Sequence, residues 1–269
     1  MSRVFYVVAM VAAAAVVTLP AQVNQTDDFS CDDVGNNRRL ESFCEIREEM
    51  FSGNTIDVDA SPNGGIRVIG WNRNEIQVRS RVVASARTEQ DARNLASSVT
   101  VTTANGRVRA DGPESRRDEQ WFVSFEVRVP DDGRVSLSTR NGGISILDFR
   151  GTARFAARNG GVSLSNVNGD IRGETVNGGI NVDLTGSRWD GAGLDVETRN
   201  GGVRMSIPAN YSAQLETGTV NGGLRIDFPV TFRGNIPTGR TRRFSTTLGS
   251  GGAPIRAVTT NGGITIRER

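Results

Sequence analysis

Residues 141–146 read Asn141-Gly142-Gly143-Ile144-Ser145-Ile146, and this pattern recurs along most of the chain. The Asn-Gly-Gly triplet returns at Asn159, Asn177, Asn200, Asn221 and Asn261, with an earlier copy at Asn63. In every copy an aliphatic residue, a variable residue and a second aliphatic residue follow. Because Gly adopts positive φ without steric cost and Asn does so more readily than most residues, the triplet predicts a sharp corner of the backbone.

The spacing of the triplets defines a repeat. From Asn141 onward the asparagines are 18, 18, 23, 21 and 40 residues apart, so 18 residues is the unit, with corner loops in the longer intervals and a larger insertion in the last. A second break lies near the middle of most units, at Gly151, Asn168-Gly169, Gly191 to Gly193 and Pro208-Ala209-Asn210. Each unit is therefore predicted to hold two strands and two corners, as in a solenoid.

Three columns appear when the units are aligned on the asparagine. The residue three places after it is Ile144, Val162, Ile180, Val203, Leu224 or Ile264, and the residue five places after it is also apolar. Two places before it stand Thr139, Ala157, Thr175, Thr198, Thr219 and Thr259. Side chains alternate faces along a strand, so the two apolar columns point inward together.

These columns favour an all-β fold, a parallel β-solenoid of two-strand coils of about 18 residues. Equivalent residues then stack on one another, and the asparagines can form a hydrogen-bonded ladder at one corner. Asn-Gly is also a strong hairpin signal, so an antiparallel β-sandwich of hairpins is the alternative fold.

The rest of the chain divides into three parts. Residues 1–21 are predicted to be a Sec-type signal peptide, because Arg3 precedes an apolar run too short to span a membrane. Residues 22–53 form an acidic, loop-rich head. Residues 54–130 are β-rich, with one short helix capped by Thr88, and residues 131–269 form the Asn-Gly-Gly array. No membrane-spanning segment is expected after signal cleavage.

The head contains the only two cysteines, Cys31 and Cys44. Export places them in an oxidising compartment, which favours a disulfide between them. Two thiols in a chain without His make a poor zinc site.

Composition excludes several function classes. The sequence has no His and no Lys, so it cannot form a Ser-His-Asp triad, a His-ligated metal site or a P-loop. A net charge of +2 is too small to indicate a nucleic-acid footprint. We expect no cofactor and no metal.

Two groups of charged residues could carry function. Glu174 and Glu197 both stand three places before their asparagine, so stacked coils would place the two carboxylates about 5 Å apart, as in a retaining glycosidase. The equivalent residues of other units build no cleft around them, which favours a solvated pair. Arg204 and Arg225 are predicted to be outward neighbours, and Arg199 precedes Asn200. These three arginines are candidate contacts for an anionic ligand.

The repeats, the strand Trp-Phe-Val-Ser-Phe-Glu-Val-Arg-Val-Pro at 121–130 and the segment from Cys31 to Glu48 resemble the bacterial "putative adhesin" β-strand-repeat family, akin to head-GIN-domain proteins. The resemblance implies an exported, all-β, non-enzymatic envelope or surface protein, periplasmic, cell-surface or extracellular, without established catalytic residues. Its partner is expected to be an anionic envelope glycan or another envelope protein. A polysaccharide-acting β-helix enzyme and a structural or signalling envelope component are the alternatives.

Overall fold

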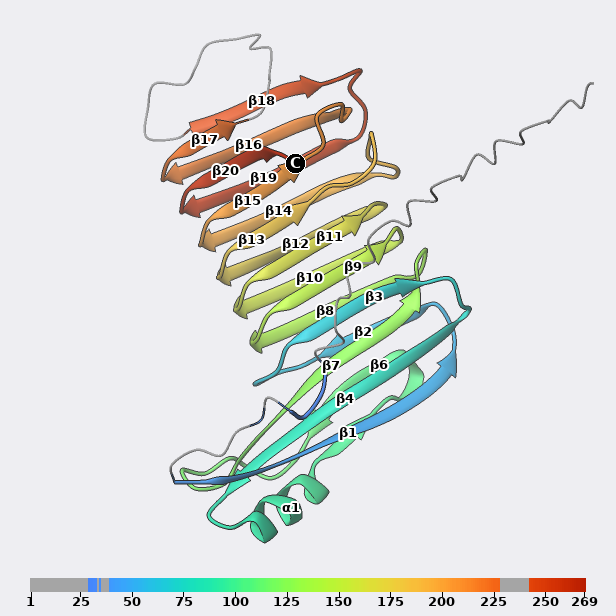
Figure 1. The fold of residues 1–269 in the computed structure, drawn as a ribbon, viewed down its shortest axis with the longest axis vertical. Helices are drawn as coiled ribbons and strands as arrows, with labels where there is room; N and C mark the ends of the chain where they lie inside the picture. Colours follow the sequence, from blue (N-terminus) through green and yellow to red (C-terminus); the bar gives the residue numbers. More distant parts are fainter. Residues whose placement is uncertain (1–28, 33, 35–38, 228–241) are drawn as a thin grey trace, which may run out of the picture.

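The computed structural model describes residues 29–32, 34, 39–227 and 242–269 (Figure 1). The predicted signal peptide lies outside these residues. The described chain forms an elongated stack of strands with the first strands and the single α-helix at one end (Figure 1). No helix in this part of the chain is long and apolar enough to cross a membrane.

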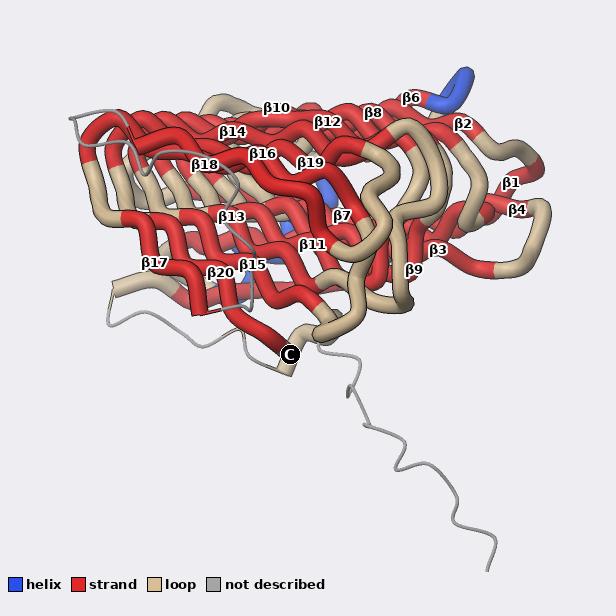
Figure 2. Tube along the Cα trace, turned by 90° about the horizontal axis from the view of Figure 1, so that it is seen from above, coloured by secondary structure: helices blue, strands red, loops and turns tan. Residues whose placement is uncertain are grey.

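Two ten-stranded sheets face each other and enclose the core (Figure 2). The first sheet contains the strands that follow the triplets. Its order is β1 (Glu41–Ser52), β4 (Glu75–Ala86), β7 (Gln120–Pro130), β3 (Ile66–Trp71), β9 (Ile144–Phe149), β11 (Val162–Val167), β13 (Ile180–Asp183), β15 (Val203–Ile207), β20 (Ile264–Glu268), β17 (Leu224–Asp227).

The second sheet contains the strands that precede the triplets. Its order is β18 (Arg242–Leu248), β16 (Ala213–Asn221), β19 (Pro254–Asn261), β14 (Gly193–Asn200), β12 (Asp170–Asn177), β10 (Thr152–Asn159), β8 (Arg134–Asn141), β2 (Thr55–Asp59), β6 (Arg107–Asp111), β5 (Thr100–Thr102). Each coil contributes one strand to each sheet, and neighbouring coils pair in parallel register. The predicted β-solenoid is confirmed, and the sandwich of hairpins is wrong.

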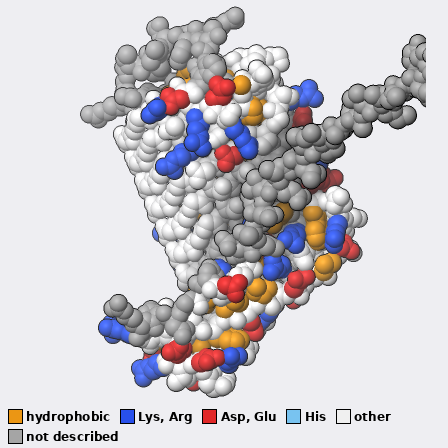
Figure 3. All heavy atoms as spheres, viewed as in Figure 1, with side chains coloured by type: hydrophobic (Ala, Val, Ile, Leu, Met, Phe, Trp, Pro, Cys, Tyr) orange, Lys and Arg blue, Asp and Glu red, His pale blue; other side chains and the backbone are white. Residues whose placement is uncertain are grey.

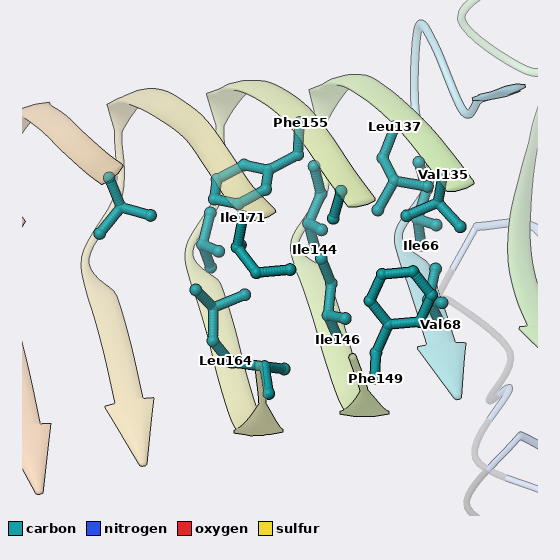
Figure 4. Close-up of a cluster of buried hydrophobic side chains, with 14 of the residues drawn as sticks. Ile66, Val68, Val135, Leu137, Ile144, Ile146, Phe149, Phe155, Leu164 and Ile171 are labelled. Atoms are coloured by element: carbon teal, nitrogen blue, oxygen red, sulfur yellow. The ribbon is translucent and has the colours of Figure 1, made fainter. Parts of the chain in front are cut away.

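The predicted inward columns form the core. Ile144 pairs with Val162, and Val162 pairs with Ile180, so the aliphatic side chains lie in rows along the stack. These rows are buried except in β17, where Leu224 and Ile226 are half-buried at the end of the first sheet. Figure 4 shows side chains from both sheets meeting between them, among them Phe149 and Phe155. Burying each such side chain contributes about 1.5–3 kcal/mol.

The asparagines form the predicted ladder. The ladder runs in the order Asn63, Asn141, Asn159, Asn177, Asn200, Asn261, Asn221, and Nδ2 of each asparagine after the first donates to Oδ1 of the one before it at 2.8–2.9 Å. The threonine column lies just inside this corner. Thr175 Oγ1, for example, donates to the carbonyl oxygen of Gly160 at 2.8 Å. Side chains at each corner thus bind one coil to the next.

The prediction that the Asn-Gly-Gly triplets adopt positive φ is wrong. No residue of any Asn-Gly-Gly triplet has φ in the left-handed region. The first glycine is instead required by contact between coils, because a Cβ built on Gly142 would lie 2.0 Å from the carbonyl oxygen of Gly64. The same clash, at 1.9–2.0 Å, occurs for Gly160, Gly178, Gly201, Gly222 and Gly262.

The coils do not stack in sequence order, contrary to our expectation. β19 pairs with both β14 and β16, and β20 pairs with both β15 and β17. The coil formed by β19 and β20 therefore lies between two coils that precede it in the sequence (Figure 1). The second sheet ends with β18, which comes from the long last interval and is antiparallel to β16.

Antiparallel strands and a helix close the other end of the stack. β4 pairs with β7 and β1 pairs with β4, both antiparallel, and α1 (Glu89–Ser98) packs on β4 and β1. The Thr88 hydroxyl caps α1 by accepting the N–H of Asp91 at 3.1 Å, as predicted. β2 and β3 pair with β8 and β9, so the coil with Asn63 is the first coil of the stack.

The head is more regular than predicted. Residues 41–52 are strand β1 and not a loop, because twelve of their residues pair in register with β4. The predicted disulfide between Cys31 and Cys44 is present and ties the preceding segment to β1. Within that segment Phe29 is buried, with the guanidinium groups of Arg79 and Arg81 at 5.4 and 5.6 Å from its ring centre.

The glycine contact predicts that Gly142→Ala lowers the free energy of unfolding by about 2 kcal/mol or more, because the added methyl group must separate two coils. Gly65→Ala, where the nearest atom would be 3.4 Å away, is the matched control and should cost less than 1 kcal/mol. Urea unfolding followed by circular dichroism measures both. Equal losses for the two variants would contradict this account.

The ladder predicts that Asn177→Ala lowers the free energy of unfolding by about 1 kcal/mol or more, because it removes a bond to Asn159 and one from Asn200. Asn181→Ala, an exposed change in β13 of the same coil, should remain within about 0.5 kcal/mol of wild type. Thermal unfolding of both variants checks the difference.

Candidate functional site

A large cleft lies at the corner opposite the asparagine ladder. It has a volume of about 920 Å³. The first coil, the next two coils and the loop after β13 line it, through Gly70, Trp71, Asn72, Asp131, Asp148, Arg150, Asn166, Asn168, Thr185, Gly186, Ser187, Arg188 and Asp190. Almost all of its side chains are polar, and they come from successive coils held in fixed register.

Asp148 and Asn166 occupy equivalent places at the ends of β9 and β11, and both adopt left-handed backbone conformations, with φ of 53° and 51°. The next residue in each strand, Phe149 or Val167, is buried. A left-handed residue at this position lets the chain turn while its apolar neighbour enters the core. Non-Gly residues hold this conformation at an energetic cost, and such strain is often found at functional sites.

Side chains of three coils are joined across the cleft. Thr185 Oγ1 donates to Asn166 Oδ1 at 2.5 Å, and Asn166 Nδ2 donates to Asp148 Oδ1 at 2.6 Å. In the first coil the equivalent residue is Gly70, where a Cβ would lie 2.0 Å from the carbonyl oxygen of Asp148. The row of polar groups therefore ends at Gly70, and the indole of Trp71 follows it.

Ion pairs fix the sides of the cleft. Arg150 Nε donates to Asp131 Oδ2 at 3.1 Å, and this bond raises the pKa of Arg150. Arg188 Nε donates to Asp190 Oδ1 at 3.1 Å. The loop that carries Asp190 is anchored by Trp189, which is buried and donates its indole N–H to the carbonyl oxygen of Gly169 at 2.9 Å.

Trp71 lies at the end of the cleft near the first coil. Its indole N–H donates to the carbonyl oxygen of Glu75 at 2.8 Å, and the guanidinium of Arg73 lies 5.0 Å from its ring centre. The side chain is half-buried, so part of the indole faces solvent. The ring is thus held rigidly beside a row of hydroxyl, amide and carboxylate groups.

This arrangement offers hydrogen-bond donors and acceptors to a polar ligand. Each of the three carboxylates in the cleft accepts a hydrogen bond from an amide or a guanidinium group. Among the described residues no group of three or more His, Cys, Asp or Glu side chains is placed to hold a metal ion.

A second, shallower hollow of about 420 Å³ crosses the outer face of the first sheet beside Phe29. Its floor is made of small residues, among them Gly143, Ser145, Gly161 and Ser163. Figure 3 shows an uncharged area over the middle of the array, with charged side chains gathered toward its two ends.

The structure does not bring the three predicted arginine contacts together. Arg204 and Arg225 both pair with Thr265, which lies between them, so the prediction that they are neighbours is wrong. The cause is the inserted coil of β19 and β20. Arg225 forms an ion pair with Asp227 of its own strand at 2.6 Å. Arg199 lies on β14 of the second sheet, on the other side of the corner from Arg204.

Glu174 and Glu197 are neighbours in register, as predicted. Glu197 also lies 3.6 Å from Arg256, which donates to Asp195 at 2.7 Å. The two glutamates therefore stand on the outer face of the second sheet, and neither lines the cleft.

Sequence reasoning missed the cleft residues. One signal could have found part of them, because Asp148 and Asn166 both stand seven places after the asparagine of their coil and precede a buried apolar residue. Trp71 ends strand β3, Asp131 lies in the short turn after β7, and Asp190 lies in the loop after β13, so no periodic pattern links the three.

The fold and the cleft define the class of protein: a β-solenoid whose stacked coils display a polar, preformed cleft along one corner. The chain belongs to the Toastrack DUF4097 family, whose model matches residues 75–267. This match confirms the resemblance inferred from the repeats. None of the curated proteins matches the chain.

Several solved structures resemble the chain at low sequence identity. One is a putative cell adhesion protein from Clostridium sporogenes, with 9% identity and a TM-score of 0.42, covering 84% of this chain and 100% of its own. A putative adhesin from Bacteroides fragilis has 11% identity and a TM-score of 0.31, over 84% and 97% of the two chains. A putative adhesin from Parabacteroides merdae has 10% identity and a TM-score of 0.29, over 88% and 98%.

The strained backbone at Asn166 predicts a difference between two substitutions. Both Asn166→Gly and Asn166→Ala remove the side-chain bonds to Asp148 and Thr185, but only Ala must hold a left-handed conformation with a Cβ. Asn166→Ala should therefore be less stable than Asn166→Gly by about 1 kcal/mol. Chemical unfolding measures this difference, and equal stabilities would show that the backbone has relaxed.

Proposed function

We propose that this protein is an exported, non-enzymatic surface or envelope protein that binds a carbohydrate chain in the corner cleft. The observation that carries the proposal is the row of mutually bonded polar side chains, Thr185, Asn166 and Asp148, that three successive coils present beside an indole. Because the coils fix these groups in advance, little ordering is required when a ligand binds.

The chemistry of the cleft suits a sugar. Amide, carboxylate and guanidinium groups offer paired donors and acceptors that match neighbouring hydroxyl groups. An indole offers an apolar surface together with a fixed orientation. The volume, about 920 Å³, lies within the range of ligand-binding sites. The coils are about 4.8 Å apart, so a linear polymer can meet equivalent groups in successive coils.

Charge favours a neutral glycan over a strongly anionic one in this cleft. Arg150 and Arg188 are each paired with an aspartate of the cleft, whereas Asp148 is bonded to an amide. The predicted anionic glycan would therefore meet an additional carboxylate here. Arg199 and Arg204, on the two sides of the asparagine corner, stay candidate contacts for such a polymer outside the cleft. Another envelope protein is the alternative partner.

Export is supported by the disulfide between Cys31 and Cys44, since such bonds persist in oxidising compartments. The apolar run of residues 5–19 in the sequence fits a signal peptide. Together these features support a location of the proposed binding site in the periplasm, on the cell surface or outside the cell.

A glycan array that includes envelope polysaccharides, followed by titration of the best ligand, tests the proposal. Asn166→Gly should weaken binding about tenfold, because it removes an amide from the row while keeping the backbone. Asn181→Ala, outside the cleft, is the control and should bind like the wild type. The proposal fails if the wild type binds no glycan, or if Asn166→Gly binds as tightly as the control.

A further inference from the structure

The position of the last coil separates two coils that are neighbours in the sequence. The coil of β14 and β15 and the coil of β16 and β17 do not pair with each other, since the coil of β19 and β20 lies between them. We call this space, bounded by β14, β15, β16 and β17, the insertion slot. The asparagine ladder passes through it without interruption, from Asn200 to Asn261 to Asn221.

The repeat signature alone does not select this order. Thr219, Asn221 and Gly222 stand where Thr259, Asn261 and Gly262 stand in the inserted coil, and both sets make the same corner contacts. Stacked in sequence order, the coil of β16 and β17 could extend the ladder from Asn200 just as the inserted coil does. Another interaction must therefore favour insertion.

Charged residues on the outer faces of the two sheets provide the interaction that favours insertion. The registers place Asp195 and Glu216 on either side of Arg256, and Arg204 and Arg225 on either side of Thr265. Without the inserted coil the two acidic residues would be direct neighbours, and so would the two arginines. Like charges directly opposite each other are destabilising in a sheet. The sequential order would therefore create one repulsive pair on each sheet.

Arg256 turns this repulsion into attraction. Its guanidinium donates to Asp195 at 2.7 Å and lies 3.6 Å from Glu197 and 3.8 Å from Glu216. Burial acts to lower the pKa of Arg256, but the bond to Asp195 and the charges of the two glutamates raise it above its ordinary value. The Arg256 side chain is about one-third exposed, so these pairs are less screened than fully exposed ones.

Two further hydrogen bonds join the inserted coil to the strands of the slot. Thr217 Oγ1 donates to the carbonyl oxygen of Ala257 at 2.7 Å, and Arg267 Nε donates to Ser206 Oγ at 3.3 Å. The strands that β19 and β20 pair with are all strands of the slot. The inserted coil is thus held by a complementary surface on each side.

We infer that the insertion slot is a binding surface for the coil of residues 254–268, and that it accepts this coil from a second copy of the chain as well as from its own. Every contact described above depends only on the coil and the slot, so a coil from either chain forms the same set. Exchange of an identical element is a low-cost route to a dimer. For a surface protein, such exchange would link copies through the ends of their stacks.

Engineered disulfides test this inference in the full chain. Arg204 and Thr265 are partners in register, and neither substitution removes Arg256. One copy carries Arg204→Cys and the other Thr265→Cys. The two are unfolded in urea and refolded together, with Cys31 and Cys44 kept oxidised. We expect a crosslinked heterodimer whose yield rises with protein concentration.

Controls decide between exchange and non-specific crosslinking. The double variant Arg204→Cys/Thr265→Cys should crosslink within one chain, which shows that the slot forms. Replacing Arg204→Cys by Ser163→Cys, on β11 away from the slot, should abolish the heterodimer. Adding Arg256→Glu to the copy with Thr265→Cys should lower the yield about tenfold, because it replaces attraction by repulsion. The inference is overturned if the double variant crosslinks but no heterodimer forms at any concentration.

Discussion

Contact between successive coils at the Asn-Gly-Gly corner is the constraint on which the rest of the structure depends. The first glycine of a triplet leaves no space for a Cβ, since that atom would lie 1.9–2.0 Å from a carbonyl oxygen of the adjacent coil. This approach lets the asparagine and threonine side chains reach their partners in the next coil. Once the corner is fixed, the aliphatic columns follow in register.

At the opposite corner the length and sequence of the coils are less restricted. There the coils differ in length and carry loops such as residues 185–192, and the polar residues Asp148 and Asn166 take left-handed conformations. One edge of the stack thus maintains the register, while the other varies and forms the cleft. This division agrees with the general location of binding sites on loops held by a rigid scaffold.

Charged residues on the outer faces favour one order of the coils, which the contacts at the Asn-Gly-Gly corner do not select. All coils share the Asn-Gly-Gly signature, so the ladder by itself does not select one order of stacking. The ion pairs of Arg256 with Asp195 and Glu216, and the separation of Arg204 from Arg225 by Thr265, favour the observed order. Weak surface electrostatics can select between arrangements whose corner contacts are alike.

The sequence by itself determined the two-strand coil, the inward columns, the asparagine ladder, the helix after Thr88 and the disulfide, because each depends on local periodicity or on residues of one type at equivalent places. It did not determine the order of the coils, which produced the wrong prediction for Arg204 and Arg225. It also missed the cleft, since Trp71 ends strand β3 whereas Asp131 and Asp190 lie in connecting segments, and no periodic pattern links the three. Only the tertiary structure decides which coils meet and which loops converge, because both depend on contacts between residues far apart in the chain.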